Sequence, residues 1–192
     1  MKNTVQSVHS VHSVHPFVLA ASARKASYRE HASKPVVVAS GRAFPHLEDM
    51  KLYTIGYEGE PQAAVIDRLK AAGVTVLADV RAVAASRRAG FSKSVLGSSL
   101  AEAGIEYVHL RDLGTPKAGR DAARKGRIGE MRDIFARHME EPPSQLAFER
   151  LREIARDRPT ALLCFEADHA GCHRAVLAER LATEDGFEVV NL

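Results

Sequence analysis

From Met50 onward the sequence alternates short apolar runs with longer helical patterns, and this alternation limits the possible folds more than any other feature. The apolar run Val74–Val80 is typical of a strand buried on both faces. Parallel strands need crossover connections, and such crossovers are right-handed, so the alternation predicts helices on both faces of one sheet. We therefore predict an α/β fold: a doubly wound, mainly parallel, Rossmann-like sheet of about five strands. The expected strands are Lys51–Ile55, Val74–Val80, Ile105–Leu110, Thr160–Phe165 and Phe187–Leu192.

Helix start and stop signals lie between these strands. Pro61 falls where the first turn of a helix tolerates proline, and Gly73 ends the same pattern. Pro142 and Pro143 separate two further helical stretches, because proline disrupts a helix interior. The expected helices cover about Pro61–Gly73, Ser92–Ala103, Gly119–Glu141, Ser144–Arg156 and Cys172–Gly186.

The first 49 residues differ from the rest in composition. They hold six lysines or arginines against three acids, whereas residues 50–192 hold 21 of each, so the formal net charge of +3 comes from this part. The triplet Ser-Val-His repeats three times between Ser7 and His15, with no helix or strand period after it. A histidine-rich tract can bind metal. We expect instead either a flexible tail or a mis-assigned upstream start: a disordered, dispensable N-terminal extension, followed by a single domain over residues 50–192.

Targeting signals and cysteine content bear on the location of the protein. No apolar stretch reaches the roughly 18 residues of a membrane helix. The short run His15–Ala23 ends in Ala-x-Ala but has no basic region before it beyond Lys2, unlike a signal peptide. Cys164 and Cys172 are the only cysteines, too few for a secreted disulfide scaffold. We expect a cytoplasmic protein with free thiols and no membrane partner.

The loops that follow the strands carry the candidate functional residues, because ligands of doubly wound sheets bind beyond the carboxyl ends of the strands. The loop Arg81–Lys93 holds four cations and no acid, and residues 111–137 hold eight cations against four acids. Gly90 and Ser92 add free amides at a helix start. These features predict an anionic ligand such as a phosphate or a nucleic-acid backbone. A solvated helix face is the alternative for residues 124–137.

Two acidic residues follow strands and have two interpretations each. Glu58 lies between two glycines, which allow a backbone to approach a ligand closely, but it could also be a turn carboxylate in water. Asp79 ends a buried strand two residues before Arg81, so a structural ion pair and a substrate clamp are both open.

Cys172 stands at the first turn of the last expected helix, where free amides and the helix dipole favour negative charge, beside His173 and Arg174. We therefore predict a thiol pKa below the free value of about 8.5. Four roles are open: a nucleophile, half of a redox pair, a metal ligand with Cys164, Glu166 and His173, or packing beside an anion site. The Cys-x7-Cys-His spacing is not that of a zinc finger, so metal is the least favoured role and no metal site is predicted. Packing suits Cys164 best, because it lies inside a strand.

Four segments together resemble the bacterial and archaeal family known as domain of unknown function 488. They are TIGYEG from Thr54, LADVRAVAASRRAGFSK from Leu77, GIEYVHLRDLG from Gly104 and LLCFEADHAGCHR from Leu162. The resemblance covers about residues 51–192 and implies membership, although no activity is assigned to the family. Members usually begin near the first strand, which implies that residues 1–49 are additional.

The resemblance also implies a set of site positions. Ala84 and Ala89 stand where family members often carry proline, which implies a less rigid loop with the same charge. The family pattern falls on Gly56, Tyr57, Glu58, Gly59, Asp79, Arg81, Ser86, Gly90, Phe91, Ser92, Lys93, His109, Leu113, Gly114, Cys164, Glu166, Cys172, His173 and Arg174.

Two hypotheses from different classes follow. The protein is an enzyme on a phosphorylated or nucleotide-like substrate, or a non-catalytic module that binds a nucleotide or nucleic acid through the same loops. An aromatic content of 6% without tryptophan offers few stacking platforms, which favours a small ligand over a single strand. The sequence indicates neither a cofactor nor an oligomeric state.

The candidate residues are expected to meet at one end of the sheet. The candidate catalytic residues are Glu58, Glu166, Cys172 and His173, and the candidate binding residues are Tyr57, Arg81, Ser86, Lys93, His109 and Arg174. Of the binding residues, Ser86 and His109 come from the resemblance alone. The residues expected to line one pocket are Tyr57, Glu58, Arg81, Glu166, Cys172, His173 and Arg174.

Overall fold

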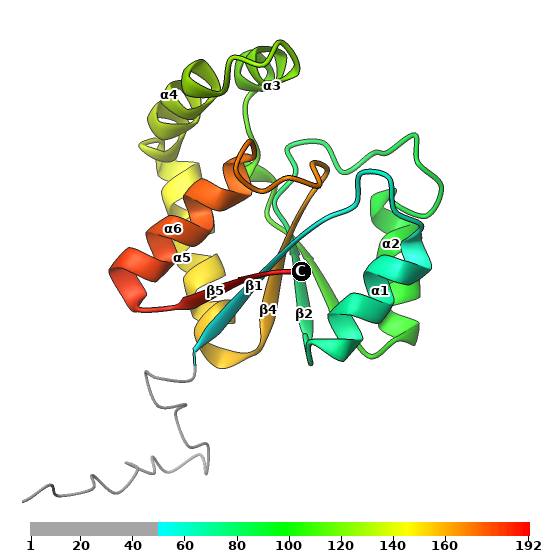
Figure 1. The fold of residues 1–192 in the computed structure, drawn as a ribbon. Helices are drawn as coiled ribbons and strands as arrows, with labels where there is room; N and C mark the ends of the chain where they lie inside the picture. The colour runs from blue at the N-terminus through cyan, green and yellow to red at the C-terminus, as the bar shows by residue number, and fades with distance from the viewer. Residues whose placement is uncertain (1–49) are drawn as a thin grey trace, which may run out of the picture. The chain divides into compact units, whose positions relative to one another are not determined.

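A computed structural model describes residues 50–192; residues 1–49, for which an extension was predicted, lie outside the described part of the chain. One parallel sheet runs through the described residues, with the strand order β3-β2-β4-β1-β5 (Figure 1). This arrangement confirms the doubly wound α/β fold predicted from the sequence. The strands are β1 (Lys51–Gly56), β2 (Val76–Asp79), β3 (Glu106–His109), β4 (Thr160–Cys164) and β5 (Glu188–Asn191).

Helices cover both faces of this sheet. The chain moves outward from β1 through β2 to β3, with α1 and α2 on one side, then returns through β4 to β5, with α5 and α6 on the other (Figure 1). Right-handed crossovers require this change of side when the direction reverses. No helix in residues 50–192 combines the length and apolar character that crossing a membrane requires. The helices are α1 (Gln62–Ala71), α2 (Lys93–Glu102), α3 (Lys117–Arg124), α4 (Ile128–Met139), α5 (Pro142–Asp157) and α6 (His173–Asp185), with a 3-10 turn η2 (Arg111–Leu113).

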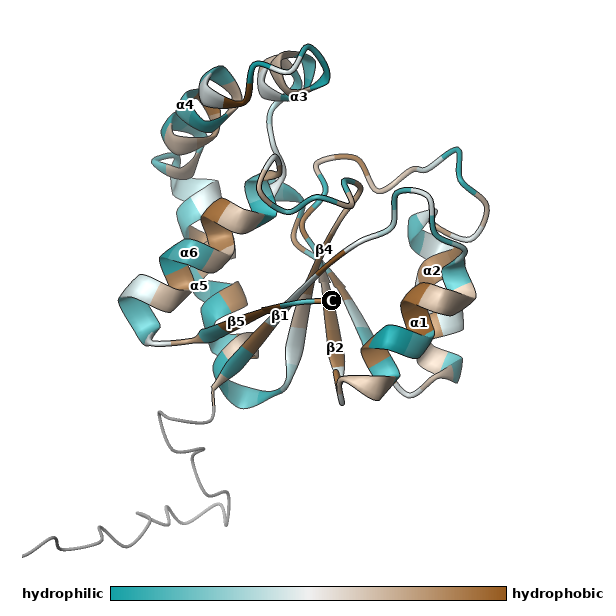
Figure 2. Cartoon of the chain, viewed as in Figure 1, coloured by the Kyte–Doolittle hydropathy of each residue, from teal (hydrophilic) through white to brown (hydrophobic). Residues whose placement is uncertain are grey.

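Neighbouring residues of a strand point to opposite faces, and each face has its own apolar core. Leu163 of β4 packs in a cluster with Leu69 of α1, and its neighbour Leu162 packs in a second cluster with Leu177 of α6. All four side chains are almost completely buried, and each such burial contributes about 1.5–3 kcal/mol. In Figure 2 the strands are largely brown, whereas the helices carry teal on part of their surface.

The region predicted as one helix over Gly119–Glu141 forms two helices, α3 and α4, so that prediction was wrong. Gly126 has φ +72°, a left-handed conformation that glycine adopts without a Cβ penalty. The amide of Arg127 donates to the carbonyl of Ala122 at 3.0 Å, which closes the end of α3. The chain then turns back, and α4 packs against α3. The following helix, α5, begins at Pro142 rather than Ser144, with both prolines in its first turn, where no amide is lost.

The end of β1 lies directly against the loop that follows β4. A Cβ atom on Gly56 would lie 1.9 Å from the carbonyl oxygen of Glu166. The amides of Tyr57 and Glu58 both donate to the carbonyl of Phe165, at 3.1 and 2.9 Å. Gly56 is therefore the residue that lets the β4–α6 loop reach the end of β1.

We expect Gly56→Ala to destabilise the protein by about 1–3 kcal/mol or more, because the added methyl group forces the loop backbone away. Gly97→Ala is the matched control: its Cβ would meet Tyr107 at an ordinary 3.7 Å within helix α2. That change should be neutral or stabilise by up to about 1 kcal/mol, since alanine favours helix. Urea unfolding measures both, and equal stabilities for the two variants would contradict the close approach.

Candidate functional site

A cavity of about 870 Å³ lies at the carboxyl ends of β1, β2 and β4. Its wall is built from residues 57–58 after β1, residues 81–88 after β2, residues 164–173 after β4, and parts of α3 and α4. The volume is within the range of small-molecule sites. The cavity lies at the end of the sheet where the sequence analysis expected a ligand.

A buried polar network holds the ends of three strands beside this cavity. The guanidinium group of Arg81 binds both carboxylate oxygens of Asp79, at 2.8 and 2.5 Å. The same group donates to the hydroxyl of Tyr57 at 2.7 Å and to the carbonyl of Phe91 at 3.0 Å. Tyr107 of β3 donates its hydroxyl to Asp79 at 2.5 Å. These bonds tie β1, β2, β3 and the start of α2 together.

Arg81 is thus committed to the protein rather than to a ligand. The side chain is 5% exposed and the carboxylate of Asp79 is fully buried, so each charge depends on the other. Burial alone would lower the pKa of Arg81, but the hydrogen bond and the charge of Asp79 raise it above its usual value. Of the two interpretations that the sequence left open for Asp79, the geometry is that of a structural ion pair.

Arg174 is also used inside the protein. Its side chain is buried, and its guanidinium group donates to the carbonyls of Glu166 and Ala167. Thr54 of β1 accepts a longer bond, at 3.5 Å, from its Nε. Arg174 does not line the cavity. Its hydrogen bonds to two backbone carbonyls stabilise the β4–α6 loop.

Other arginines line the cavity, and the sequence analysis marked their segments without naming them. Arg87 and Arg88 come from the β2–α2 loop, and Arg120 and Arg124 come from α3. Arg88 donates to the carbonyl of Glu60 and Arg120 to that of Thr115, both neutral acceptors. Arg124, 68% exposed, pairs with Asp121. Both α3 arginines lie before the turn at Gly126 that separates α3 from α4.

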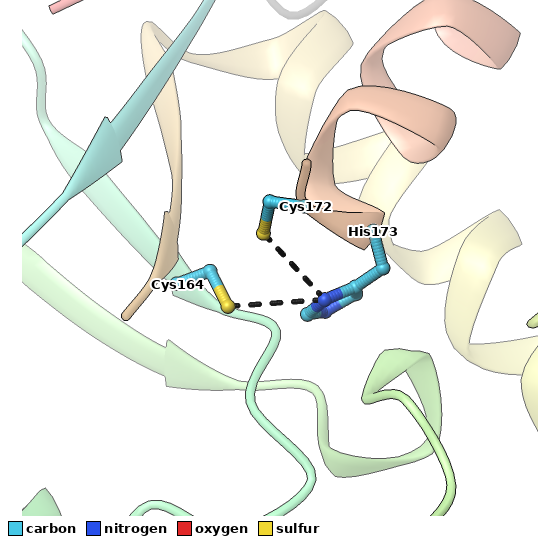
Figure 3. A group of neighbouring side chains, drawn as sticks. All are labelled: Cys164, Cys172 and His173. Atoms are coloured by element: carbon cyan, nitrogen blue, oxygen red, sulfur yellow. Dashed lines mark hydrogen bonds between the residues drawn. The ribbon is translucent and has the colours of Figure 1, made fainter. Parts of the chain in front are cut away.

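The same cavity is lined by a cluster of two thiols, an imidazole and a carboxylate that lie together: Cys164, Cys172, His173 and Glu166. Figure 3 shows the two cysteines and the histidine. Cys164 ends β4, Cys172 is the N-cap of α6, and His173 is the first residue of that helix. The Nδ1 atom of His173 lies 3.8 Å from the sulfur of Cys164 and 3.7 Å from that of Cys172. Both sulfurs also contact the Oε2 atom of Glu166, at 2.9 and 3.2 Å. The two sulfurs and Nδ1 all lie within 4.8 Å of one another, close enough for three ligands of one metal ion.

The predicted low pKa of Cys172 is contradicted by its surroundings. Its contact with Cys164 and its burial raise the thiol pKa far above the usual value, and nearby His173 offsets only part of this. The helix dipole and the adjacent cations favour a thiolate, but Cys172 is only 2% exposed and the guanidinium group of Arg174 donates to backbone carbonyls instead.

The other two groups of the cluster shift toward their charged forms. Burial lowers the pKa of His173, but its bonds with Cys172 and with the carbonyl of Val80 raise it overall. Burial also opposes ionisation of Glu166, yet hydrogen bonds from Cys164, a backbone amide and Cys172 hold its pKa below the usual value. Glu166 is therefore an anion in contact with both thiols.

The predicted pocket residues line the cavity, except for Arg174. Ser86 lines it as well and lies 3.4 Å from the hydroxyl of Tyr57. Lys93 and His109 do not line it; His109 instead hydrogen-bonds to the carbonyl of Arg81 at 2.9 Å. Glu58 accepts a hydrogen bond from the amide of Ala167. Catalytic and binding roles for these residues stay predictions.

Comparison with known proteins gives one match. The family model described as Domain of unknown function DUF488 matches residues 62–181, which span the chain from α1 to α6. No curated protein and no solved structure matches the chain.

The buried ion pair makes a testable prediction. We expect Asp79→Asn to lower the free energy of unfolding by about 3–5 kcal/mol, because it leaves the buried Arg81 without a counter-charge. The double variant Asp79→Leu/Arg81→Met should lose less, because it leaves no lone charge. Asp121→Asn, which breaks an exposed pair on α3, is the control and should change stability little. Urea unfolding tests this, and a small effect of Asp79→Asn would show that Arg81 is not desolvated.

The thiol environment predicts the pH dependence of alkylation. Because the pKa of Cys172 is raised, the thiolate forms only at high pH, and the alkylation rate should inflect above the free value of about 8.5. Cys164→Ala should lower this inflection, because it removes the hydrogen-bonding contact that is the largest cause of the shift. Mass spectrometry of chelator-treated protein locates the modified sulfur, and an inflection below the free value in the unaltered protein would restore the original prediction.

Proposed function

The chain belongs to the DUF488 family, and because that family has no assigned activity, we propose from the cavity itself that the protein binds an anionic, phosphate- or nucleotide-like ligand at the carboxyl ends of its strands. One observation carries the proposal. Within residues 50–192, Arg87, Arg88 and Arg120 line the same cavity and none of them forms an ion pair. Positive charges left unpaired around a concave site attract and hold anions.

Apolar side chains at the same cavity favour a nucleotide over a bare phosphate. Val83 and Phe165 are 53% and 39% exposed although both are large and apolar, and both line the cavity. Phe165 is held edge-on by Tyr57, with ring centroids 5.3 Å apart. A base stacks well on such a fixed ring, while guanidinium groups bind phosphate oxygens with charge-assisted hydrogen bonds.

The catalytic part of the proposal assigns acid or base work to Glu58 and Glu166. Glu166 is ionised and lies at the cavity wall, and it can accept a proton there. Cys172 is a poor nucleophile in this form, because its raised pKa leaves little thiolate at neutral pH. The alternative is a module that binds the same ligand without chemistry, and the buried state of both thiols is the observation that favours it.

The cytoplasm is the location that we propose. Cys164 and Cys172 are free and lie close together, and a reducing compartment keeps neighbouring thiols in that state.

Binding can be measured by calorimetry with inorganic phosphate, a nucleoside, the matching nucleoside mono- and diphosphates, and a short DNA strand. We expect the nucleotides to bind more tightly than either the nucleoside or phosphate alone. Arg87→Ala and Arg120→Ala should each weaken nucleotide binding by about 10–100-fold, the loss expected for a hydrogen bond to a charged group.

Arg150→Ala is the matched control, since Arg150 is exposed on α5 and does not line the cavity. Equal affinities of the control and the cavity variants, or tighter binding of the uncharged nucleoside, would overturn the proposal. Conversion of a bound nucleotide to product would distinguish an enzyme from a non-catalytic binding module. Glu166→Gln should abolish that conversion.

A further inference from the structure

We propose that Cys164, Cys172 and His173 form a zinc-binding site in the wall of the cavity. The site goes beyond the anion-binding proposal and does not depend on it, because it uses other residues. The spacing of these residues along the chain matches no zinc finger, which is why the sequence analysis ranked metal last. The fold removes that objection by placing the end of β4 beside the start of α6 (Figure 3).

The distances fit a tetrahedral ion. Zinc bonds of about 2.3 Å to sulfur and 2.0–2.1 Å to nitrogen place a sulfur and a nitrogen ligand about 3.6 Å apart. The observed separations between Nδ1 of His173 and the sulfurs of Cys164 and Cys172 are 3.8 and 3.7 Å. The two nitrogen-to-sulfur separations are therefore within a few tenths of an ångström of those around zinc, and the two sulfurs lie within 4.8 Å of each other. All three side chains are already buried.

The second nitrogen of His173 supports the same conclusion. Its Nε2 atom lies 2.9 Å from the carbonyl oxygen of Val80, which can only accept a hydrogen bond, so Nε2 carries a proton. The lone pair of the neutral ring is then on Nδ1, the atom that faces the two sulfurs. Metal-binding histidines are held in this way by a backbone carbonyl or a carboxylate on the far nitrogen. Phe135 of α4 fixes the ring further, edge-to-face at 5.2 Å.

Binding of the ion is an exchange for protons. The two thiols now donate to Glu166, and they become thiolates when zinc binds, releasing two protons to solvent without any change of oxidation state; where the imidazole is charged, a third proton leaves Nδ1 of His173. Two thiolates and a neutral imidazole compensate the charge of the ion. The three ligands leave a fourth position, and because all three line the cavity, water can reach it from there beside the carboxylate of Glu166. Thiolate ligands select zinc over magnesium or calcium.

Cobalt titration of the full-length, chelator-treated and reduced protein tests the site. We expect one equivalent of Co²⁺ to give a thiolate-to-cobalt charge-transfer band and the intense visible bands of tetrahedral cobalt, and Zn²⁺ to displace it. The repeated histidines between Ser7 and His15 cannot produce this band, because the chain has only two cysteines and both belong to the site. Zinc should also protect both thiols from alkylation, a measurement that needs no variant.

Cys164→Ser, Cys172→Ser and His173→Gln should each weaken cobalt binding by about 100-fold or more, since even outer partners of a metal ligand contribute 10–100-fold. Asp168→Asn is the matched control, because this exposed acid is in the same loop without contacting either sulfur. Circular dichroism confirms that the variants are folded. Cobalt that binds without a charge-transfer band, thiols that zinc leaves unprotected, or a Cys164–Cys172 disulfide in protein that takes up no metal would each overturn the site.

Discussion

The buried pair of Asp79 and Arg81 is the interaction on which the cavity depends. It joins the ends of β1, β2 and β3 through Tyr57 and Tyr107, and removing two charges from water costs several kcal/mol unless they are paired and hydrogen-bonded. Each buried charge of the pair therefore depends on the hydrogen bonds that the other charge and the two tyrosines make to it. Arg174 has the matching role on the other side, where its guanidinium group holds the carbonyls of the β4–α6 loop. Each buried arginine fixes one wall of the cavity.

The fold could be predicted from the sequence because its central strands β2 and β4 are buried on both faces and its helices are buried on one. Val76 to Asp79 is wholly buried, as a central strand of a parallel sheet must be. Helix boundaries depended on local signals, and the one serious error, the single helix over residues 119–141, came from a glycine. Any glycine can adopt a left-handed conformation, so Gly126 alone does not indicate a helix break. The break is evident only in the structure, where α4 packs against α3.

The site could be predicted in its position but not in the state of its residues. Loops at the carboxyl ends of parallel strands necessarily meet, so the shared cavity follows from topology. The sequence shows that Arg81 and Arg174 are charged. It does not show that Arg81 is already bound to a carboxylate and Arg174 to backbone carbonyls. Likewise, the position of Cys172 at a helix start favours a thiolate, yet burial and the second thiol outweigh the dipole. Burial is a property of the whole fold, and it decided each of these cases.

The two walls of the cavity differ in a way that suits two different ligands. Arg87 is exposed on the β2–α2 loop, so it can adjust to an anion and release it at a small cost in ordering. Cys164, Cys172 and His173 are buried and held by the end of a strand, the start of a helix and the carbonyl of Val80. Preorganised ligand atoms favour tight binding of a metal ion, because the side chains lose little conformational freedom when the ion binds. Because two thiolates offset the double charge of the ion, an anion in the same cavity of about 870 Å³ would be attracted mainly by the arginines.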